Sequence, residues 1–245
     1  MPDTVFITGA SSGIGKSLAI EFSRRGYALG LCARRLELLE SLQQEIGKNH
    51  AIEVAQLDVL DYQNVKEVFF KLAEKLGGAK IIIANAGICE KSLPGECKFD
   101  LERKVIEINL LGAMATIDAG VEIQKKHGGG QIVGISSVAG FRGLSNVPAY
   151  SASKSALSTY MEGIRHHLRK HKISVTVINP GFIDTAINTN RKFRPFLISA
   201  EKCARLTADM IEKKVMSSTV PLWPWALVSG VMKFIPERIW CRFKT

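Results

Sequence analysis

The sequence contains few of the residue patterns that bind metals or form structural disulfides. Its five histidines include no H-E-x-x-H arrangement, and its five cysteines include no C-x-x-C pair. Three of the histidines fall near the end of a basic helical pattern, where positive charge suits the helix dipole. We therefore expect no metal site, and free thiols in a reducing compartment at Cys32, Cys89, Cys97, Cys203 and Cys241.

A long hydrophobic run is also missing. The apolar stretch at residues 220–232 is shorter than the ~20 residues that span a bilayer, and Pro221 and Pro224 interrupt it. The first residues, MPDTVFITGA, enter a strand pattern directly, without the basic segment and apolar run of a secretory signal. These absences favour a cytoplasmic protein.

Acidic residues are outnumbered, since 33 Lys and Arg stand against 23 Asp and Glu and give a formal charge of +10. Such an excess suits a polyanionic cofactor, an anionic membrane surface or nucleic acid, and it suits an ordinary solvated surface as well. No platform of interleaved aromatic and basic residues is apparent, which argues against nucleic acid as a partner.

Short runs rich in Val and Ile alternate with longer amphipathic patterns along the chain. Strand patterns occur at 4–9, 27–33, 129–137 and 173–181, and helical patterns at 12–26, 35–47, 100–127 and 149–171. This alternation predicts parallel β-α-β units. We expect an α/β fold in one domain over residues 1–245. Its core is a Rossmann-type doubly wound parallel sheet of about seven strands flanked by helices, with a C-terminal apolar helical extension.

The stretch TGASSGIG (residues 8–15) stands where the first strand pattern gives way to the first helical pattern. Glycines at 9, 13 and 15 allow a sharp turn and a close approach of the backbone to a ligand. The free N–H groups of the helix start then suit a pyrophosphate. Three glycines alone are weak evidence, but their place at the first strand–helix junction favours a dinucleotide.

The second strand ends in CARR, with Ala33 where NAD-binding sheets usually carry an acid for the ribose 2′-hydroxyl. A guanidinium binds a 2′-phosphate that a carboxylate would repel. We therefore expect NADP(H) rather than NAD(H), with Arg34 as the first contact and Arg35 or Ser11 assisting. Two solvent-facing arginines at a helix start remain the alternative.

These motifs together resemble the classical short-chain dehydrogenase/reductase family, from Thr4 to about Thr185. The segments that carry the resemblance, in family order, are TGASSGIG (8–15), LDV (57–59), ANAG (84–87), EINLLG (107–112), GISSVAG (134–140), YSASK (150–154) and PGFIDT (180–185). The sequence departs from the family at Ala84, where the family has a first asparagine.

The resemblance implies four catalytic residues. Tyr150 is the expected general acid/base, and Lys154, four residues on and so on the same helix face, lowers the pKa of its phenol and binds the nicotinamide ribose. Ser137 is expected to hydrogen-bond the substrate carbonyl, with Ser136 as a rival at a less suitable spacing. Asn109 is expected to hold a water that links Lys154 to solvent. The expected cofactor-binding residues are Gly9, Ser11, Ser12, Gly13, Ile14, Gly15, Arg34, Arg35, Asp58, Val59, Asn85, Ala86, Gly87, Tyr150, Lys154, Pro180, Gly181, Ile183 and Thr185.

The function that this resemblance implies is NADP(H)-dependent transfer of hydride between the nicotinamide and a carbonyl or secondary alcohol. An apolar small-molecule substrate is expected. A 3-oxoacyl thioester reductase is an enzyme alternative. A catalytically weak NADP(H)-sensing protein, regulatory or bound to a membrane surface, is the alternative of another class.

Two segments lie outside the shared motifs. Residues 186–205 take the place of a substrate-covering loop, where Arg191, Lys192 and Arg194 flank Phe193 and Phe196; the mix suits an acidic group on a long apolar substrate or a solvated lid.

Residues 223–245 combine three tryptophans with basic residues, which suits peripheral contact with a membrane, or a helix that covers the cleft or another subunit. A homodimer through the patterns at about 100–127 and 149–171 is the family habit; a tetramer stays open.

Overall fold

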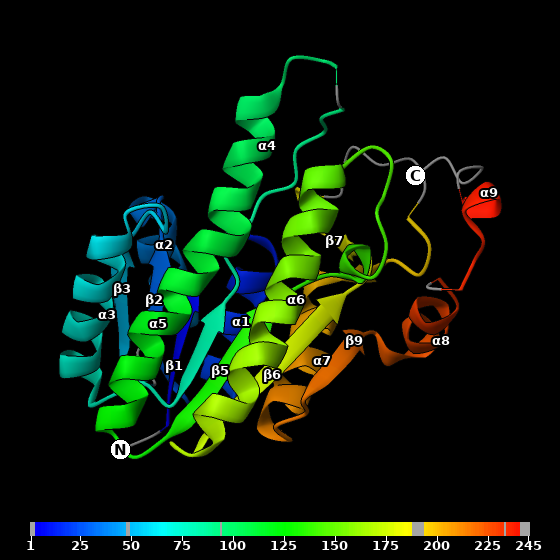
Figure 1. Ribbon diagram of the computed structural model, residues 1–245. Helices are drawn as coiled ribbons and strands as arrows, with labels where there is room; N and C mark the ends of the chain where they lie inside the picture. Colours follow the sequence, from blue (N-terminus) through cyan, green and yellow to red (C-terminus); the bar gives the residue numbers. More distant parts are fainter. Residues whose placement is uncertain (1–2, 48–49, 94, 188–193, 233, 241–245) are drawn as a thin grey trace.

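The computed structural model describes residues 3–47, 50–93, 95–187, 194–232 and 234–240. Seven parallel strands form one sheet in the order β3-β2-β1-β4-β5-β6-β9, with helices on both faces (Figure 1). The expected doubly wound parallel sheet is therefore confirmed. The strands are β1 Thr4–Thr8, β2 Ala28–Ala33, β3 Ile52–Gln56, β4 Ile81–Ala84, β5 Gly130–Ile135, β6 Ile173–Pro180 and β9 Ser217–Val220. A separate pair consists of β7 Ile183–Asp184 and β8 Ile198–Ser199.

The helices follow the strands in the expected alternation. They are α1 Gly13–Arg24, α2 Leu36–Ile46, α3 Tyr62–Leu76, α4 Phe99–Ile106, α5 Gly112–Lys126, α6 Pro148–Arg169, α7 Ala200–Glu212, α8 Leu222–Met232 and α9 Glu237–Trp240. The short elements η1 Glu107–Leu111, a π-helix, and η2 Val138–Gly140, a 3-10 helix, lie between them.

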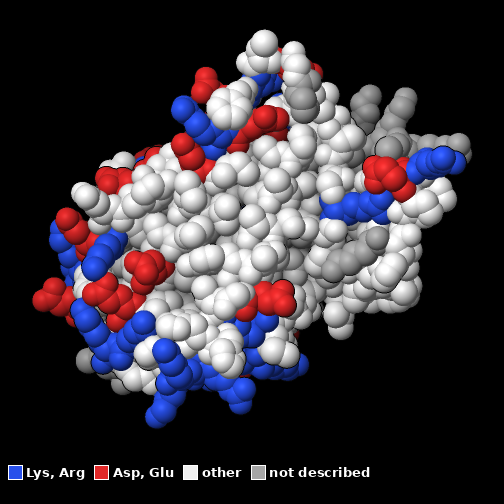
Figure 2. Space-filling model, in the orientation of Figure 1, with Lys and Arg blue, Asp and Glu red and all other residues white. Residues whose placement is uncertain are grey.

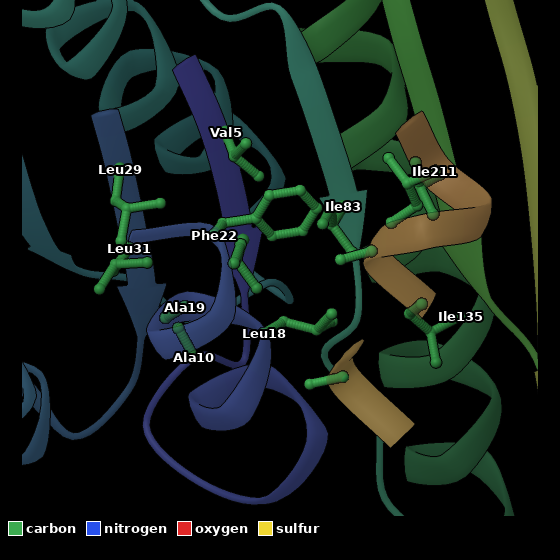
Figure 3. Packing of buried hydrophobic residues seen from close by; sticks show 14 of the residues in the cluster. Val5, Ala10, Leu18, Ala19, Phe22, Leu29, Leu31, Ile83, Ile135 and Ile211 are labelled. Carbon is green, nitrogen blue, oxygen red and sulfur yellow. The ribbon is translucent and has the colours of Figure 1, made fainter. Parts of the chain in front are cut away.

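Alternate residues of the central strands fill two separate cores, because successive strand side chains point to opposite faces of the sheet. Val5 packs with Phe22 of α1 on one face (Figure 3), and Ile7 belongs to the same core. Phe6 packs with Phe69 of α3 on the other, with ring centroids 5.6 Å apart. The two cores hold the strands between two helical layers, which fixes where each strand ends.

Each core also contains one cysteine. Cys32 of β2 lies in the core under α3, α5 and α6, and Cys203 of α7 lies in the opposite one. Burial raises the pKa of both thiols to about 12.

The helical pattern expected at 100–127 is not one α-helix. It is divided into α4, the π-helix Glu107–Leu111 and α5, and within this stretch the Gly112 N–H bonds to the Glu107 carbonyl, five residues back. Gly112 allows this irregular segment to approach β3's end closely, since a Cβ there would lie 2.6 Å from Val59 Cγ2. Apolar periodicity did not indicate the extra residue in the turn.

The last strand, Ser217–Val220, ends before Pro221, which has no N–H to continue the ladder. It pairs with β6 and forms one edge of the sheet, and α8 follows it directly (Figure 1). Trp223 is extended within α8, with φ −97° and ψ 132°. Among the described residues, no helix is both long and apolar enough to cross a membrane.

Candidate active site

One cleft of about 400 Å³ opens at the carboxyl ends of the central strands. It lies across β1 and β4, where the strand order reverses, and such switch points are where doubly wound sheets bind ligands. Its lining residues are Gly9, Ser11, Ser12, Gly13, Ile14, Ala33, Arg34, Arg35, Leu57, Asp58, Val59, Asn85, Ala86, Gly87, Ile88, Ile108, Ile135, Ser136, Ser137, Tyr150, Lys154, Pro180, Gly181, Ile183, Thr185, Ala186 and Ile187.

The turn between β1 and α1 depends on glycine at three positions for two reasons. Gly9 and Gly13 have φ of +69° and +55°, which residues with a side chain rarely adopt. A Cβ at Gly15 would collide with the Gly9 carbonyl and with Asn85 Nδ2, so Gly15 lets α1 start close to β4's end. Gly15 does not line the cleft; it shapes the loop from behind.

Asn85 joins this turn to the neighbouring strand. Its Nδ2 donates to the Thr8 carbonyl at 2.9 Å, and its backbone N–H donates to Thr8 Oγ1 at 3.2 Å. The Gly-rich turn is thereby held against the end of β4, with α1's amino end facing the cleft. The resulting cradle suits a pyrophosphate.

The end of β2 forms the basic rim of the cleft. Arg35 Nη2 donates to Ser11 Oγ at 3.1 Å and to Ser12 Oγ at 3.0 Å, so its guanidinium reaches across to the Gly-rich turn. The Arg34 side chain is exposed, and its carbonyl accepts from Gln56 Nε2. Both arginines line the cleft, but Arg35 makes the contact with the serines.

The loop after β3 closes the same end. Asp58 Oδ1 accepts from the Leu60 N–H at 3.1 Å, which orients the carboxylate at the cleft wall beside Val59. A carboxylate held in this way is able to accept from an amino group, as on an adenine ring.

Tyr150 and Lys154 lie one helical turn apart in α6. Lys154 Nζ is 5.8 Å from the centre of the Tyr150 ring and donates to the Ile135 carbonyl at 2.8 Å. The lysine is 4% exposed, and this burial lowers its pKa to about 8. At neutral pH the amine is therefore still mostly protonated, and its positive charge stays beside the phenol.

Asn109 is fully buried behind the cleft and does not line it. Its side-chain amide exchanges two hydrogen bonds with the backbone of Ile88, and its Nδ2 also donates to Ser153 Oγ at 3.1 Å. Gly87 lies between Asn109 and Lys154, since a Cβ at Gly87 would lie 3.2 Å from Asn109 Oδ1 and 3.4 Å from Lys154 Nζ. The π-helix thus brings Asn109 close to Lys154.

Ser136 and Ser137 both follow β5, and their hydrogen bonds distinguish them. Ser136 Oγ donates to the Lys154 carbonyl at 2.8 Å and meets Ser158 Oγ, so it ties the strand to α6. Ser137 Oγ accepts from the Ala139 N–H and lies 3.5 Å from the Pro180 carbonyl, at the cleft. This geometry favours Ser137 as the hydroxyl that meets a substrate.

The segment after β6 forms the remaining wall. Gly181 leaves room for Trp225 of α8, because a Cβ at Gly181 would collide with the indole. Trp225 also packs against Phe182 and Phe196, with ring centroids 6.0 and 5.7 Å away. The C-terminal region therefore supports the cleft wall from outside.

The cleft thus contains every expected site residue except Gly15 and Asn109, which lie behind it. The apolar liners Leu57, Ile88, Ile108 and Ile135, and Ala186 and Ile187 after them, were not among the expected residues. Only their position next to the motifs offered a signal. Of the expected lid residues, Arg191, Lys192 and Phe193 lie outside the described residues, and Arg194 pairs with Asp184 at 3.2 Å. In the described part of the chain, no group of His, Cys, Asp or Glu is arranged to hold a metal ion.

Comparisons with known proteins agree with this arrangement. The model for the family "short chain dehydrogenase" matches residues 3–194. An uncharacterised oxidoreductase of Mycobacterium tuberculosis is 34% identical over 243 residues, covering 98% of this chain and 96% of the relative. Another, from Myxococcus xanthus, is 34% identical and covers 96% and 93%.

Two solved structures share the fold. An alcohol dehydrogenase from the archaeon Thermococcus sibiricus, complexed with 5-hydroxy-NADP, superposes with a TM-score of 0.81 at 25% identity, covering 89% of this chain and 95% of that chain. A carveol dehydrogenase of Mycobacterium avium, in complex with NAD, gives a TM-score of 0.82 at 24% identity over the same shares.

Proposed function

The chain belongs to the short chain dehydrogenase family, a family of oxidoreductases, and from that premise we propose a specific reaction. The protein transfers hydride between NADP(H) and a carbonyl or secondary alcohol of an apolar substrate. The observation that carries this proposal is that Tyr150, Lys154 and Ser137 all line the same cleft.

In the reducing direction, NADPH held in this cleft would supply the hydride that adds to the carbonyl carbon. The electron pair of the carbonyl π bond moves to the oxygen, and the Tyr150 hydroxyl donates its proton there. Ser137 Oγ hydrogen-bonds the same oxygen while negative charge develops on it. The positive charge of Lys154 stabilises the phenolate that remains, and the reverse sequence oxidises an alcohol.

NADP(H) is the proposed cofactor because the end of β2 has Ala33 in place of an acid and two arginines beside it. Arg35, already bonded to Ser11 and Ser12, supports this side of the cleft as the site of the 2′-phosphate. The residues present also fit the rest of a dinucleotide, since Gly9 and Gly13 line the cleft at the amino end of α1, where a pyrophosphate would bind, and Asp58 lines it where an adenine amino group would donate.

The direct test replaces Tyr150 with phenylalanine. Tyr150→Phe should reduce turnover by about 10²–10⁴-fold or more, because the proton donor is lost, while NADPH still binds. Turnover is measured by NADPH absorbance on a panel of ketones, aldehydes and 3-oxoacyl thioesters, and NADPH binding by fluorescence titration. Tyr160→Phe, on the same helix, is the matched control and should keep wild-type activity.

Two results would contradict the proposal. Substantial activity in Tyr150→Phe would remove the phenol from the mechanism. A wild-type protein that binds NADPH but reduces nothing on the panel would favour a cofactor-sensing protein on the same fold.

A homodimer through α4, α5 and α6 also belongs to the proposal. Figure 2 shows few charged residues over α5 and α6 in the middle of this face. Leu101 of α4 and Leu111 of the π-helix are exposed apolar side chains. Charge-depleted surface is typical of interface cores. Cytoplasmic location stays a proposal; the free thiols of the described Cys32, Cys97 and Cys203 support a reducing compartment.

A further inference from the structure

The loop between the two expected catalytic groups Ser137 and Tyr150 is attached to the far C-terminal elements. Arg142 lies in this loop, just after the short helix Val138–Gly140, and its side chain is only 15% exposed. None of the family motifs includes this residue, and the proposed reaction gives it no role.

The Arg142 guanidinium binds three groups of the C-terminal region. Nη1 donates to the Met232 carbonyl at 2.6 Å and to the Ile235 carbonyl at 2.5 Å, and Nη2 pairs with Glu237 Oε2 at 2.9 Å. It therefore satisfies a carbonyl at the end of α8 and fixes the start of α9. A planar fork with several donors makes this combination, which a lysine ammonium reproduces only in part.

Trp240 completes the contact from the other side. The guanidinium lies 4.8 Å from the centre of the Trp240 ring, and Trp240 Nε1 donates to the Gly143 carbonyl at 3.0 Å. Glu237 and Trp240 thus join α9 to the same loop, at the consecutive residues Arg142 and Gly143.

The other end of α8 reaches the opposite wall of the cleft. Trp225 is buried under Gly181 and against Phe182, next to the Pro180 carbonyl that lies near Ser137 Oγ. The segment from Trp225 to Trp240 consequently contacts both the loop between Ser137 and Tyr150 and the segment after β6, where Pro180 and Gly181 line the cleft. The cofactor-binding Gly-rich turn and the end of β2 lie at the other end of the cleft.

We propose that Arg142 is a positioning residue: it fastens the C-terminal segment across the substrate end of the cleft and so sets which carbonyl substrates react. This inference rests on the proposed function. Without Arg142, Met232, Ile235 and Glu237 lose their bonds to the loop, and the Trp240–Gly143 bond that remains holds the apolar wall that includes Trp225 less firmly in position. The kcat/KM for large apolar substrates falls most, because these substrates contact the largest part of this wall.

The test compares Arg142→Gln with wild type on a long-chain and a short-chain aldehyde. The ratio of kcat/KM for the long over the short substrate should fall about tenfold or more, within the range typical of lost apolar contacts in a pocket. NADPH affinity should stay within about twofold, because the cofactor contacts are distant. Arg142→Lys should recover part of the ratio, and Arg238→Gln, at an exposed arginine of α9, should leave it unchanged.

The ratio separates positioning from simple loss of folded protein, since a smaller active fraction lowers the measured kcat/KM of both substrates by the same factor. An unchanged ratio, or an equal fall for both substrates, overturns the proposal. Hydrogen exchange supplies a second readout: Arg142→Gln should speed exchange in residues 138–147 and 232–240, and unchanged exchange there also overturns it. If wild type reduces no substrate while exchange responds as expected, the proposed function has failed rather than the attachment.

Discussion

At the scale of single residues, Lys154 meets two opposing requirements. It must be charged to stabilise a phenolate, yet it is buried, and burial favours its neutral form. The balance leaves its pKa at about 8, below the usual 10.5 of lysine. Between these values the folded protein binds fewer protons than the unfolded chain. Stability therefore rises with pH in this window, and the cost of the buried charge is fully present below it.

Lys154→Met removes this contribution. In the cofactor-free protein, the free energy of unfolding of wild type should gain up to about 2 kcal/mol relative to Lys154→Met between pH 8 and 9.5. Urea unfolding of both proteins at several pH values measures the difference. The lost bond to the Ile135 carbonyl adds an offset that does not vary with pH, so a constant difference would contradict the prediction.

Arg35 is the residue whose loss should change cofactor choice. Arg35→Ala should raise the KM for NADPH about tenfold or more, because a charge-assisted hydrogen bond contributes about 1.5–3 kcal/mol, and leave the KM for NADH nearly unchanged. Arg34→Ala should have the smaller effect, since Arg35 makes the contacts with Ser11 and Ser12 of the Gly-rich turn. Arg169→Ala, at an exposed arginine of α6, controls for net charge. A wild-type preference for NADH would end the NADP(H) proposal.

The residues of the cleft differ in how visible they are from sequence. Tyr150 and Lys154 are four residues apart, and Gly9 and Gly13 occupy one turn, so each pair forms a local motif, and the resemblance to the family assigned a role to it. Trp225 and Arg142 contact partners more than forty positions away in the chain. No periodicity relates such pairs, and only the folded molecule shows them.

At the scale of elements, α8 is unusual because it is apolar on two faces. Trp225 and Met232 are buried, while Leu222, Trp223, Leu227 and Val231 are exposed, Trp223 by 73%. Leu227 and Val231 are four residues apart and share one outward face. Exposed apolar patches of this kind mark interaction surfaces, and we propose an anionic membrane surface as the partner. A tryptophan at the outer edge and the +10 formal charge support this choice.

Vesicle sedimentation tests this contact. The protein should bind vesicles that contain phosphatidylserine, less so at high salt, and the double variant Trp223→Ser, Leu227→Gln should bind several-fold more weakly. Leu38→Gln, at a similarly apolar exposed position of α2, is the control. Equal binding of all three proteins would contradict the membrane proposal. A molecular mass above that of one chain in lipid-free solution, lost in the double variant, would show that the apolar face of α8 binds a second copy instead.

Sequence patterns predicted some secondary-structure elements and not others. Val- and Ile-rich runs predicted the central strands well, because a strand buried on both faces is apolar throughout. The π-helix at Glu107–Leu111 was not predictable, since one extra residue in a turn hardly alters apolar periodicity. It is nevertheless the element that places Asn109 near Lys154.

At the scale of the whole molecule, alternation predicted a parallel sheet but not the order of its strands. Right-handed β-α-β crossovers and the Gly-rich turn after β1 are consistent with the observed order, in which β1 and β4 are neighbours. The resemblance to the family supplied what pattern alone did not, namely the roles expected of Asn109, Ser137, Tyr150 and Lys154. Ala84, which stands where the family has an asparagine, does not disturb the pairing of β4 with β5. Asn85 follows β4 directly and bonds to the Thr8 carbonyl.

The thiols buried in the two cores have a practical consequence. A thiolate is the form that reacts with alkylating reagents, so Cys32 and Cys203 become modified only when their own helical layer opens. The exposed Cys97 supplies the fast reference. Pulsed alkylation read by peptide mass spectrometry should give Cys32 and Cys203 the same protection if the molecule opens as one cooperative unit. Different rates would reveal that one side of the sheet is released before the other.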